Sequence, residues 1–182
     1  VYWIPSIVLG FIISLGVTIL VIPILVKKFK ESDITGVDVH KLTRPRIPER
    51  CGLSVLIGTT IASLGLLLIP LESSIKIQLL VFMSGIVIGG LIGWVDDTRG
   101  LGIKKPILMM LPAIPLLLAN FLFPGDVFNP RPEFPLVGSF RLTIIYWLAI
   151  PVAISVTSNA CNMLDVLNGS MSGCCAIVLI IL

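Results

Sequence analysis

Residues 77–97 read IQLLVFMSGIVIGGLIGWVDD, which is a run of nineteen uncharged residues followed directly by two aspartates. Five more runs of the 182-residue chain carry no charge, namely 1–26, 51–71, 106–125, 142–164 and 166–182. About 20 apolar residues suffice for a helix to cross a bilayer core, where the backbone must satisfy its own hydrogen bonds. The pattern therefore predicts an all-α polytopic membrane protein, a single membrane domain over 1–182 with six transmembrane helices.

The composition agrees, because the mean hydropathy is +1.07 and only 13% of the residues are charged. Soluble domains carry about 25% charged residues, so a soluble protein is excluded. The segments between the runs differ in basic residues. Ten of the thirteen lysines and arginines lie in 27–52 and 96–105, and three lie in 72–76 and 125–141. The positive-inside rule then predicts that 27–52, 96–105 and 165–169 are cytoplasmic, and that the amino terminus and the other two segments are outside.

The first cytoplasmic segment contains the only histidine, His40, followed by Lys41, Arg44, Arg46 and Arg50. Pro45 and Pro48 stiffen this stretch and prevent a continuous helix. A shaped, basic segment at the membrane surface suits an anionic group such as a phosphate. The simpler alternative, a solvated loop whose basic side chains meet anionic headgroups, stays open.

Asp96 and Asp97 border the third uncharged run. Carboxylates beside a membrane span are costly and are usually functional. A divalent metal, a phosphate-binding lysine or a role as base would each account for the pair. The alternative is two solvated residues that end a helix.

A third polar group ends the fifth run. Asn159, Asn162 and Asp165 are spaced three apart, so they lie along one side of the last helical turns. Asn168 and Gly169 then favour a tight turn. Hydrogen bonding between helices is the alternative to a binding role. All three polar groups are predicted on the same membrane face, and this convergence favours one active site.

With these residues in view, the chain resembles the polyprenyl-phosphate N-acetylhexosamine-1-phosphate transferase family (glycosyltransferase family 4). Three motifs carry the resemblance: GVDVHKLTRPRIPERCG at 36–52, DDTRGLGIKK at 96–105 and NACNMLDVLNG at 159–169. The residues of these motifs are most similar to those of the archaeal and eukaryotic dolichol-linked branch, whose members use UDP-GlcNAc.

The resemblance implies roles for ten residues. Asp96 and Asp97 would be the catalytic acidic pair, and Asn162 and Asp165 would hold Mg²⁺, for which Mn²⁺ can substitute. The implied substrate-binding residues are His40, Lys41, Glu49, Lys105, Asn159, Asn162 and Asn168.

Two local departures stand out. Val166 follows Asp165 where the family usually has glycine, and Cys51–Gly52, preceded by Arg50, replaces the usual Gly-Gly after the Pro-Glu pair. The family also continues for several more helices, which carry a further metal-binding aspartate and a nucleotide-sugar loop. The chain is therefore expected to be the amino-terminal part of a transferase and to be inactive alone.

The implied reaction moves GlcNAc-1-phosphate, or a related N-acetylhexosamine-1-phosphate, from a UDP-sugar to a polyprenyl or dolichyl phosphate and releases UMP. The expected location is the cell membrane, or the endoplasmic reticulum membrane in a eukaryote, with a cytoplasmic active face. The expected partners are both substrates and the bilayer, without nucleic acid, and a homodimer is compatible with them. An intramembrane prenyltransferase that uses Mg²⁺ and an isoprenoid diphosphate is the alternative, with a transporter ranked below it.

The topology can be tested with single cysteines at Asp97 and Gly138 in a background without native cysteines. We expect the two positions to react with an impermeant thiol reagent from opposite sides of the membrane. Labelling of both positions from one side would contradict a one-sided active site.

Overall fold

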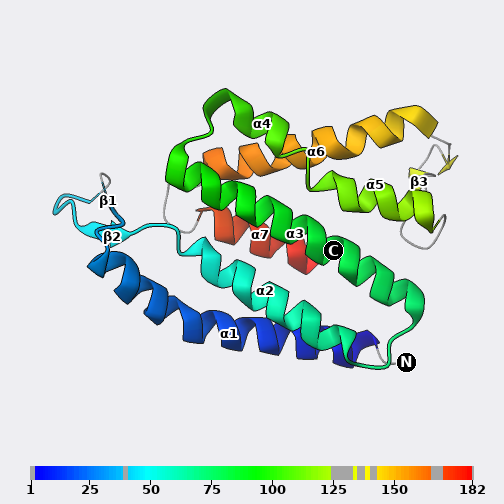
Figure 1. Cartoon of the computed structure of the whole chain (residues 1–182), viewed down its shortest axis with the longest axis horizontal. Coiled ribbons are helices and arrows are strands. Elements are labelled where there is room, and N and C mark those ends of the chain that lie inside the picture. The colour runs from blue at the N-terminus through cyan, green and yellow to red at the C-terminus, as the bar shows by residue number, and fades with distance from the viewer. Residues whose placement is uncertain are drawn as a thin grey trace. The chain divides into compact units, whose positions relative to one another are not determined.

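The computed structural model describes residues 3–38, 41–123, 133–134, 138–139, 143–164 and 170–181 and is mostly helical (Figure 1). Each uncharged run contains a helix, as predicted. The helices are α1 (Trp3–Glu31), α2 (Gly52–Leu67), α3 (Ser73–Arg99), α4 (Lys105–Leu108), α5 (Ala113–Leu122), α6 (Thr143–Leu164) and α7 (Ser170–Ile181), with a 3₁₀ turn η1 (Gly102–Lys104) before α4. The chain divides into two compact units, Val1–Gly100 and Leu101–Leu182.

In the first unit, α1, α2 and α3 lie side by side and alternate in direction, with α2 between the other two (Figure 1). The buried residues of α2 are small and four apart: Ser54, Gly58 and Ala62. A Cβ atom at Gly58 would lie 2.8 Å from the Ser14 carbonyl oxygen of α1 and would also meet the Thr18 side chain. Small residues therefore set the α1–α2 distance, as they do where apolar helices pack in membranes.

The α2–α3 contact depends on a different glycine. A Cβ atom at Gly90 would lie 2.7 Å from the Leu56 methyl carbons of α2. The sequence offers a glycine ladder at 85, 89 and 93 as the close helix contact, but a Cβ atom at Gly93 would meet nothing within 4 Å. Gly93 therefore borders open space.

Two short antiparallel hairpins interrupt the predicted all-α pattern. β1 (Thr35–Val37) pairs with β2 (Arg46–Pro48), and β3 (Glu133–Phe134) pairs with β4 (Gly138–Ser139). The first hairpin lies within the segment predicted to be non-helical, although α1 continues to Glu31. Residues Asp33 and Arg44 have positive φ angles of 54° and 41° there. These left-handed residues reverse the chain, and β pairing then satisfies backbone groups that a proline-containing helix would leave unpaired.

The fourth uncharged run, predicted as a span over 106–125, is helical but is not one regular α-helix. α4 ends at Leu108 and α5 begins at Ala113, with turns between them in which Met110 donates to Ile107 and Leu111 to Leu108. Pro112 has no N–H to donate to Leu108 and Pro115 has none for Leu111, so the α-helical hydrogen bonds cannot run through. In this second unit, α6 packs against α4, α5 and α7.

Three segments are long and apolar enough to cross a membrane by length and composition, namely Pro5–Glu31, Ser73–Arg99 and Gly102–Leu122, whereas Gly52–Leu67 is shorter. Large apolar side chains are exposed on them, for example Phe11 at 64% and Phe82 at 60%. Exposed apolar surface of this extent is typical of helices that face lipid. The helices are thus those of a membrane protein.

The close α1–α2 contact makes a stability prediction. Replacing Gly58 with alanine forces Cβ into the Ser14 carbonyl, and overpacking of this kind costs about 1–3 kcal/mol. Gly16 of α1 has nothing within 4 Å of its Cβ position, so Gly16→Ala should gain about 0.5–1 kcal/mol of helix propensity instead. Thermal unfolding followed by circular dichroism in detergent should show a lower melting temperature for Gly58→Ala and a higher one for Gly16→Ala. Equal shifts of the melting temperature in the two variants would contradict this packing.

Candidate functional site at the charged end of the helices

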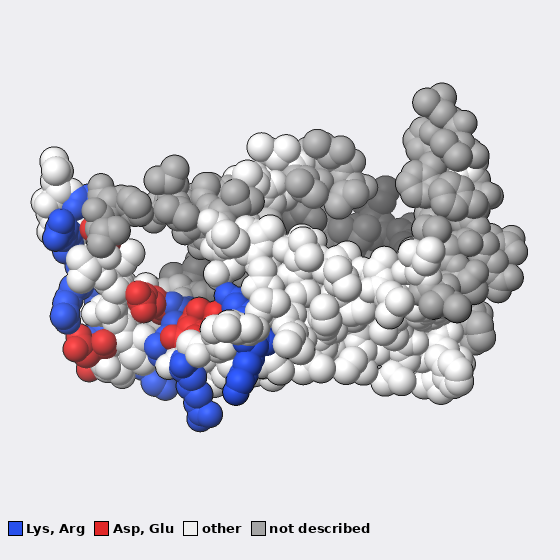
Figure 2. Space-filling model, turned by 90° about the horizontal axis from the view of Figure 1, so that it is seen from above, with Lys and Arg blue, Asp and Glu red and all other residues white. Residues whose placement is uncertain are grey.

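Charged side chains are concentrated at one end of the helices, beside a long uncharged surface (Figure 2). In the first unit this end consists of the last turns of α1, the β1–β2 hairpin and the last turn of α3. The two aspartates predicted to be catalytic lie in that last turn of α3. They are still helical, because the helix ends only at Arg99.

The end of α3 is unusual in its charge. Gly100 stops the helix with a φ of 64°, and its N–H donates to the Asp96 carbonyl at 2.8 Å. Asp96 is half-buried and Asp97 is exposed. A helix carboxyl end already carries partial negative charge, so two carboxylates there are unfavourable unless cations compensate them. Arg99 in the same turn supplies one positive charge.

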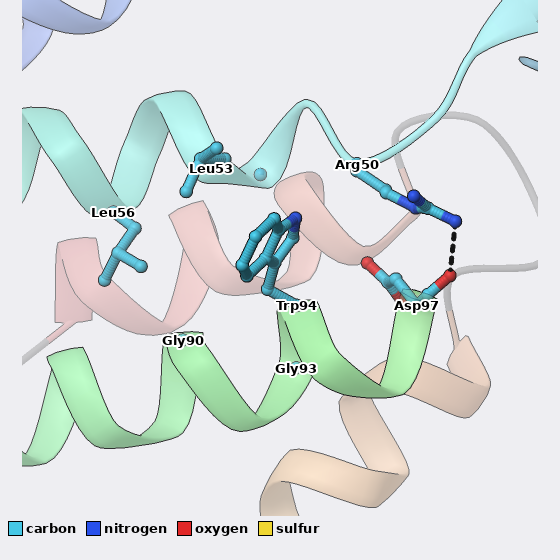
Figure 3. Close-up of a pocket in the computed structure, with 8 residues that line it drawn as sticks. Arg50, Leu53, Leu56, Gly90, Gly93, Trp94 and Asp97 are labelled. Atoms are coloured by element: carbon cyan, nitrogen blue, oxygen red, sulfur yellow. Dashed lines mark hydrogen bonds between the residues drawn. The ribbon is translucent and has the colours of Figure 1, made fainter. Parts of the chain in front are cut away.

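Arg50 supplies a second positive charge from elsewhere in the sequence. It lies between β2 and α2 with a φ of 65°, a left-handed conformation that residues other than glycine rarely adopt. Its Nη2 donates to the Asp97 backbone carbonyl at 2.8 Å (Figure 3). Arg50 thereby caps the end of α3 that carries the aspartates. The sequence indicated this residue only as a basic neighbour and as a departure before Cys51–Gly52.

A pocket of about 220 Å³ lies between α2 and α3 at this end (Figure 3). Its lining consists of Arg50, Gly52, Leu53, Leu56, Gly90, Gly93, Trp94 and Asp97. Arg50 and Asp97 form the charged end, and the remaining lining is apolar. The catalytic candidate Asp97 thus borders a pocket that can hold apolar groups.

Two other residues predicted to bind substrate, Lys41 and Glu49, lie at the β1–β2 hairpin. Lys41 forms an ion pair with Asp38 at 3.3 Å, and the Asp38 carboxylate is buried. The exposed Glu49 packs over the opposite strand, because a Cβ atom at Gly36 would lie 2.8 Å from the Glu49 carboxyl carbon. Both residues therefore have structural contacts in the hairpin. His40 lies outside the described residues.

The second unit carries the remaining candidates. Lys105 begins α4 and is half-buried, while Asn159 and Asn162 lie one turn apart near the end of α6. Asn159 donates from Nδ2 to the Ser155 carbonyl at 2.8 Å, whereas Asn162 is exposed. Asp165 and Asn168, predicted at the metal and in the sugar pocket, lie outside the described residues.

A buried serine of α6 connects this helix to the segment that contains Lys105. Ser155 is 4% exposed, and its hydroxyl donates to the Pro106 carbonyl at 2.6 Å, across 49 residues of sequence. Pro106 follows Lys105 directly, and Asn159 lies one turn after Ser155. The bond therefore holds the Lys105 segment against the part of α6 that leads to the asparagines.

No three His, Cys, Asp or Glu side chains come together as a metal site within the described ranges. The predicted metal ligands are an asparagine and an aspartate, and the aspartate lies outside those ranges. Convergence of the aspartates of the first unit with the asparagines of the second stays a prediction.

Comparison with known proteins adds to this geometry. The model of the family described as glycosyl transferase family 4 matches residues 79–182. That range contains Asp96, Asp97, Lys105, Asn159 and Asn162.

Curated relatives extend the similarity to nearly the whole chain. A Saccharolobus solfataricus protein is 28% identical over 168 residues, which is 90% of this chain and 49% of the relative. A Sulfolobus acidocaldarius protein is 30% identical over 173 residues, 92% of this chain and 49% of the relative. Both are named, provisionally, as UDP-N-acetylglucosamine–dolichyl-phosphate N-acetylglucosaminephosphotransferases. A provisionally named glycosyltransferase of Methanocaldococcus jannaschii is 29% identical over 134 residues, 74% of this chain and 36% of the relative. The chain thus spans about half the length of the first two relatives.

The Ser155 bond makes a prediction for the second unit. Ser155→Ala leaves a buried carbonyl without its donor, which costs about 1–3 kcal/mol. Ser84→Ala is the matched control, because the exposed Ser84 hydroxyl only bonds the Leu80 carbonyl of its own helix. Chemical denaturation should show a loss for Ser155→Ala and almost none for Ser84→Ala. Equal stability of the two variants would show that the bond does not hold α4 to α6.

Proposed function

The chain belongs to glycosyl transferase family 4, and from this premise we propose that the whole protein transfers GlcNAc-1-phosphate from UDP-GlcNAc to a dolichyl-type polyprenyl phosphate. The observation that carries the proposal is the end of α3, where Asp96 and Asp97 lie in the same turn as Arg99 and where Arg50 donates to the Asp97 backbone carbonyl. Carboxylates that need cations, next to basic groups that bind phosphates, are the elements that phosphoryl transfer requires.

In the proposed reaction, an oxygen of the acceptor phosphate attacks the sugar-bearing phosphorus of UDP-GlcNAc. The bond from that phosphorus to the oxygen that bridges it to the uridine-bearing phosphate breaks, and UMP leaves with that oxygen. Such a transfer depends on positioning and on neutralisation of the phosphate charges. Lys105 and the basic hairpin residue Lys41 would contact phosphates.

The donor chemistry of the candidate residues fits Mg²⁺. Mg²⁺ accepts carboxylate and amide oxygens and keeps several waters or substrate phosphates in its shell. Asn162 and Asp165 would hold the ion, with Asp96 and Asp97 beside it, and Mn²⁺ could substitute. When bound, the ion would neutralise phosphate oxygens and offset the negative end of α3.

We also propose the membrane arrangement that the charges predict. Six spans with an external amino terminus place the first hairpin, the aspartate pair and the end of α6 on the cytoplasmic face. A nucleotide sugar dissolved in the cytoplasm could then meet a lipid-anchored acceptor at the membrane surface. The three apolar segments found by length and composition support membrane crossing at those segments.

The aspartates provide the test of function. In the full-length natural protein with Mg²⁺, UDP-GlcNAc and a polyprenyl phosphate, Asp96→Asn and Asp97→Asn should each lower UMP release by roughly 100-fold or more, the scale of losing a preorganised electrostatic group. Asp33→Asn is the control, because Asp33 pairs with Arg46 at the exposed hairpin. Its turnover should stay within about twofold, since surface ion pairs contribute little.

Formation of sugar-linked lipid should parallel UMP release, and chelation of the metal should stop both. If Asp96→Asn and Asp97→Asn both turn over like the control, the pair is merely a solvated helix end. A protein that releases no UMP under these conditions contradicts the proposed reaction.

A further inference from the structure

We propose that the tip of the β1–β2 hairpin, residues 41–44, inserts into the membrane surface, with Leu42 in the bilayer interface and Arg44 at the phosphate of an anionic lipid headgroup. The partner of this surface is a bilayer that contains anionic phospholipids. The inference goes beyond the proposed function and does not depend on it, because neither Leu42 nor Arg44 is a candidate catalytic or substrate-binding residue.

The hairpin is held at the level of the membrane surface. The uncharged part of α1 ends at Val26, and Lys27 begins its charged end. Phe29 follows about 3 Å further along the helix, and its carbonyl accepts from the Ile34 N–H at 2.8 Å. Strand β2 also packs against α1 (Figure 1). Headgroups extend about 5–7 Å beyond the hydrocarbon core. With α1 across the bilayer, the hairpin therefore lies at headgroup depth.

The hairpin tip is a closed turn that presents one apolar side chain. Arg44 has a φ of 41°, and its N–H donates to the Lys41 carbonyl at 2.9 Å. Next to this turn, the Asp38 N–H donates to the Pro45 carbonyl at 3.1 Å. Leu42 is fully exposed, at 105%, so no described part of the protein covers it. A leucine side chain is stabilised by leaving water, and the bilayer interface is the apolar environment at this depth.

The charges around the tip are complementary to anionic lipids. Residues 27–49 contain six lysines and arginines and four aspartates and glutamates, a net charge of +2 with histidine neutral. Lys41 pairs with Asp38 and Arg46 pairs with Asp33, which uses two charges of each sign. The charged side chains of this range that form no ion pair with a described residue are Lys27, Lys28, Lys30, Arg44, Glu31 and Glu49. Basic side chains beside a membrane span are attracted to anionic lipids, and here they outnumber the acids.

A lipid surface accounts for the tip better than a soluble anion does. Tight binding of a soluble phosphate takes several charge-assisted hydrogen bonds that converge on it. At the tip Arg44 is exposed, and the neighbouring Lys41 and Arg46 are already paired with aspartates. A soluble anion would also leave Leu42 in water. An anionic bilayer offers many headgroups beside an apolar layer, so it suits both side chains.

Two variants separate the apolar part of the tip from its charge. Leu42→Ser removes the apolar side chain, and Arg44→Gln removes the positive charge. The matched controls lie at the opposite end of the helices of the same unit. They are Leu68→Ser, because Leu68 is 88% exposed just after α2, and Lys76→Gln near the start of α3.

The experiment uses the full-length natural protein, with its native cysteines replaced, in lipid nanodiscs. A Thr43→Cys change carries the fluorophore nitrobenzoxadiazole, whose fluorescence lifetime is long in a bilayer interface and short in water. The ratio of the two populations measures insertion. It should be higher in nanodiscs with phosphatidylglycerol than in nanodiscs of phosphatidylcholine alone, and high salt should lower it. Arg44→Gln should lower the ratio about fivefold and Leu42→Ser about 10-fold, whereas Leu68→Ser and Lys76→Gln should leave it unchanged.

Equal lifetimes in neutral and anionic nanodiscs would overturn the proposal, and so would tip variants that behave like their controls. Inorganic phosphate and UDP-GlcNAc are added at constant ionic strength. A lifetime change caused by either of them, in place of the response to lipid composition, would assign the tip to a soluble ligand and refute the bilayer as its partner. If a tip variant fails to fold, the lipid and salt series on the natural tip still decide.

Discussion

The backbone of an apolar segment must find its hydrogen bonds within itself when lipid surrounds it, and the whole structure follows from that constraint. Helices are the simplest solution, so each uncharged run contains one. The same constraint excludes charged side chains from the middle of the spans and collects them at the helix ends (Figure 2). Chemistry that needs carboxylates, amides and basic groups is therefore confined to short segments. The candidate site therefore lies at an end of the helices.

At that end, the electrostatics of one helix terminus dominate. α3 ends with two aspartates at the pole of the helix that is already negative, where cations rather than anions are stabilising. Arg99 and Arg50 offset part of this charge, and a divalent ion together with substrate phosphates would complete a balanced cluster. Two carboxylates at this helix end are thus unfavourable for the isolated helix and are compensated by basic residues. The positive φ of Arg50 is likewise unfavourable for a residue other than glycine. It is kept in the structure where Arg50 contacts α3.

Packing of small residues determines how the charged groups meet. Gly58 lets α1 and α2 approach closely, and Gly90 brings Leu56 of α2 onto α3. With α2 and α3 at this distance, the Arg50 side chain reaches the last turn of α3, and Gly93 leaves the open space that becomes the pocket. A larger residue at Gly90 would displace the Leu56 side chain from this contact. Helix packing and the chemistry of the site are therefore not independent.

The sequence by itself determined the helical runs and the excess of basic residues in 27–52 and 96–105, because these follow from local composition. Spacing likewise indicated Asp96, Asp97, Asn159 and Asn162 as candidates. It also located the polar hairpin segment, but not its β pairing or the break at Pro112 within 106–125, where proline and turn geometry outweigh hydropathy. The tertiary structure alone decided the role of Arg50, since its contact with Asp97 joins residues 47 positions apart. Likewise, Lys41 and Glu49 acquired structural partners, and Ser155 bound Pro106 across 49 residues. Contacts of this kind depend on how closely the helices pack, which no local pattern of residues encodes.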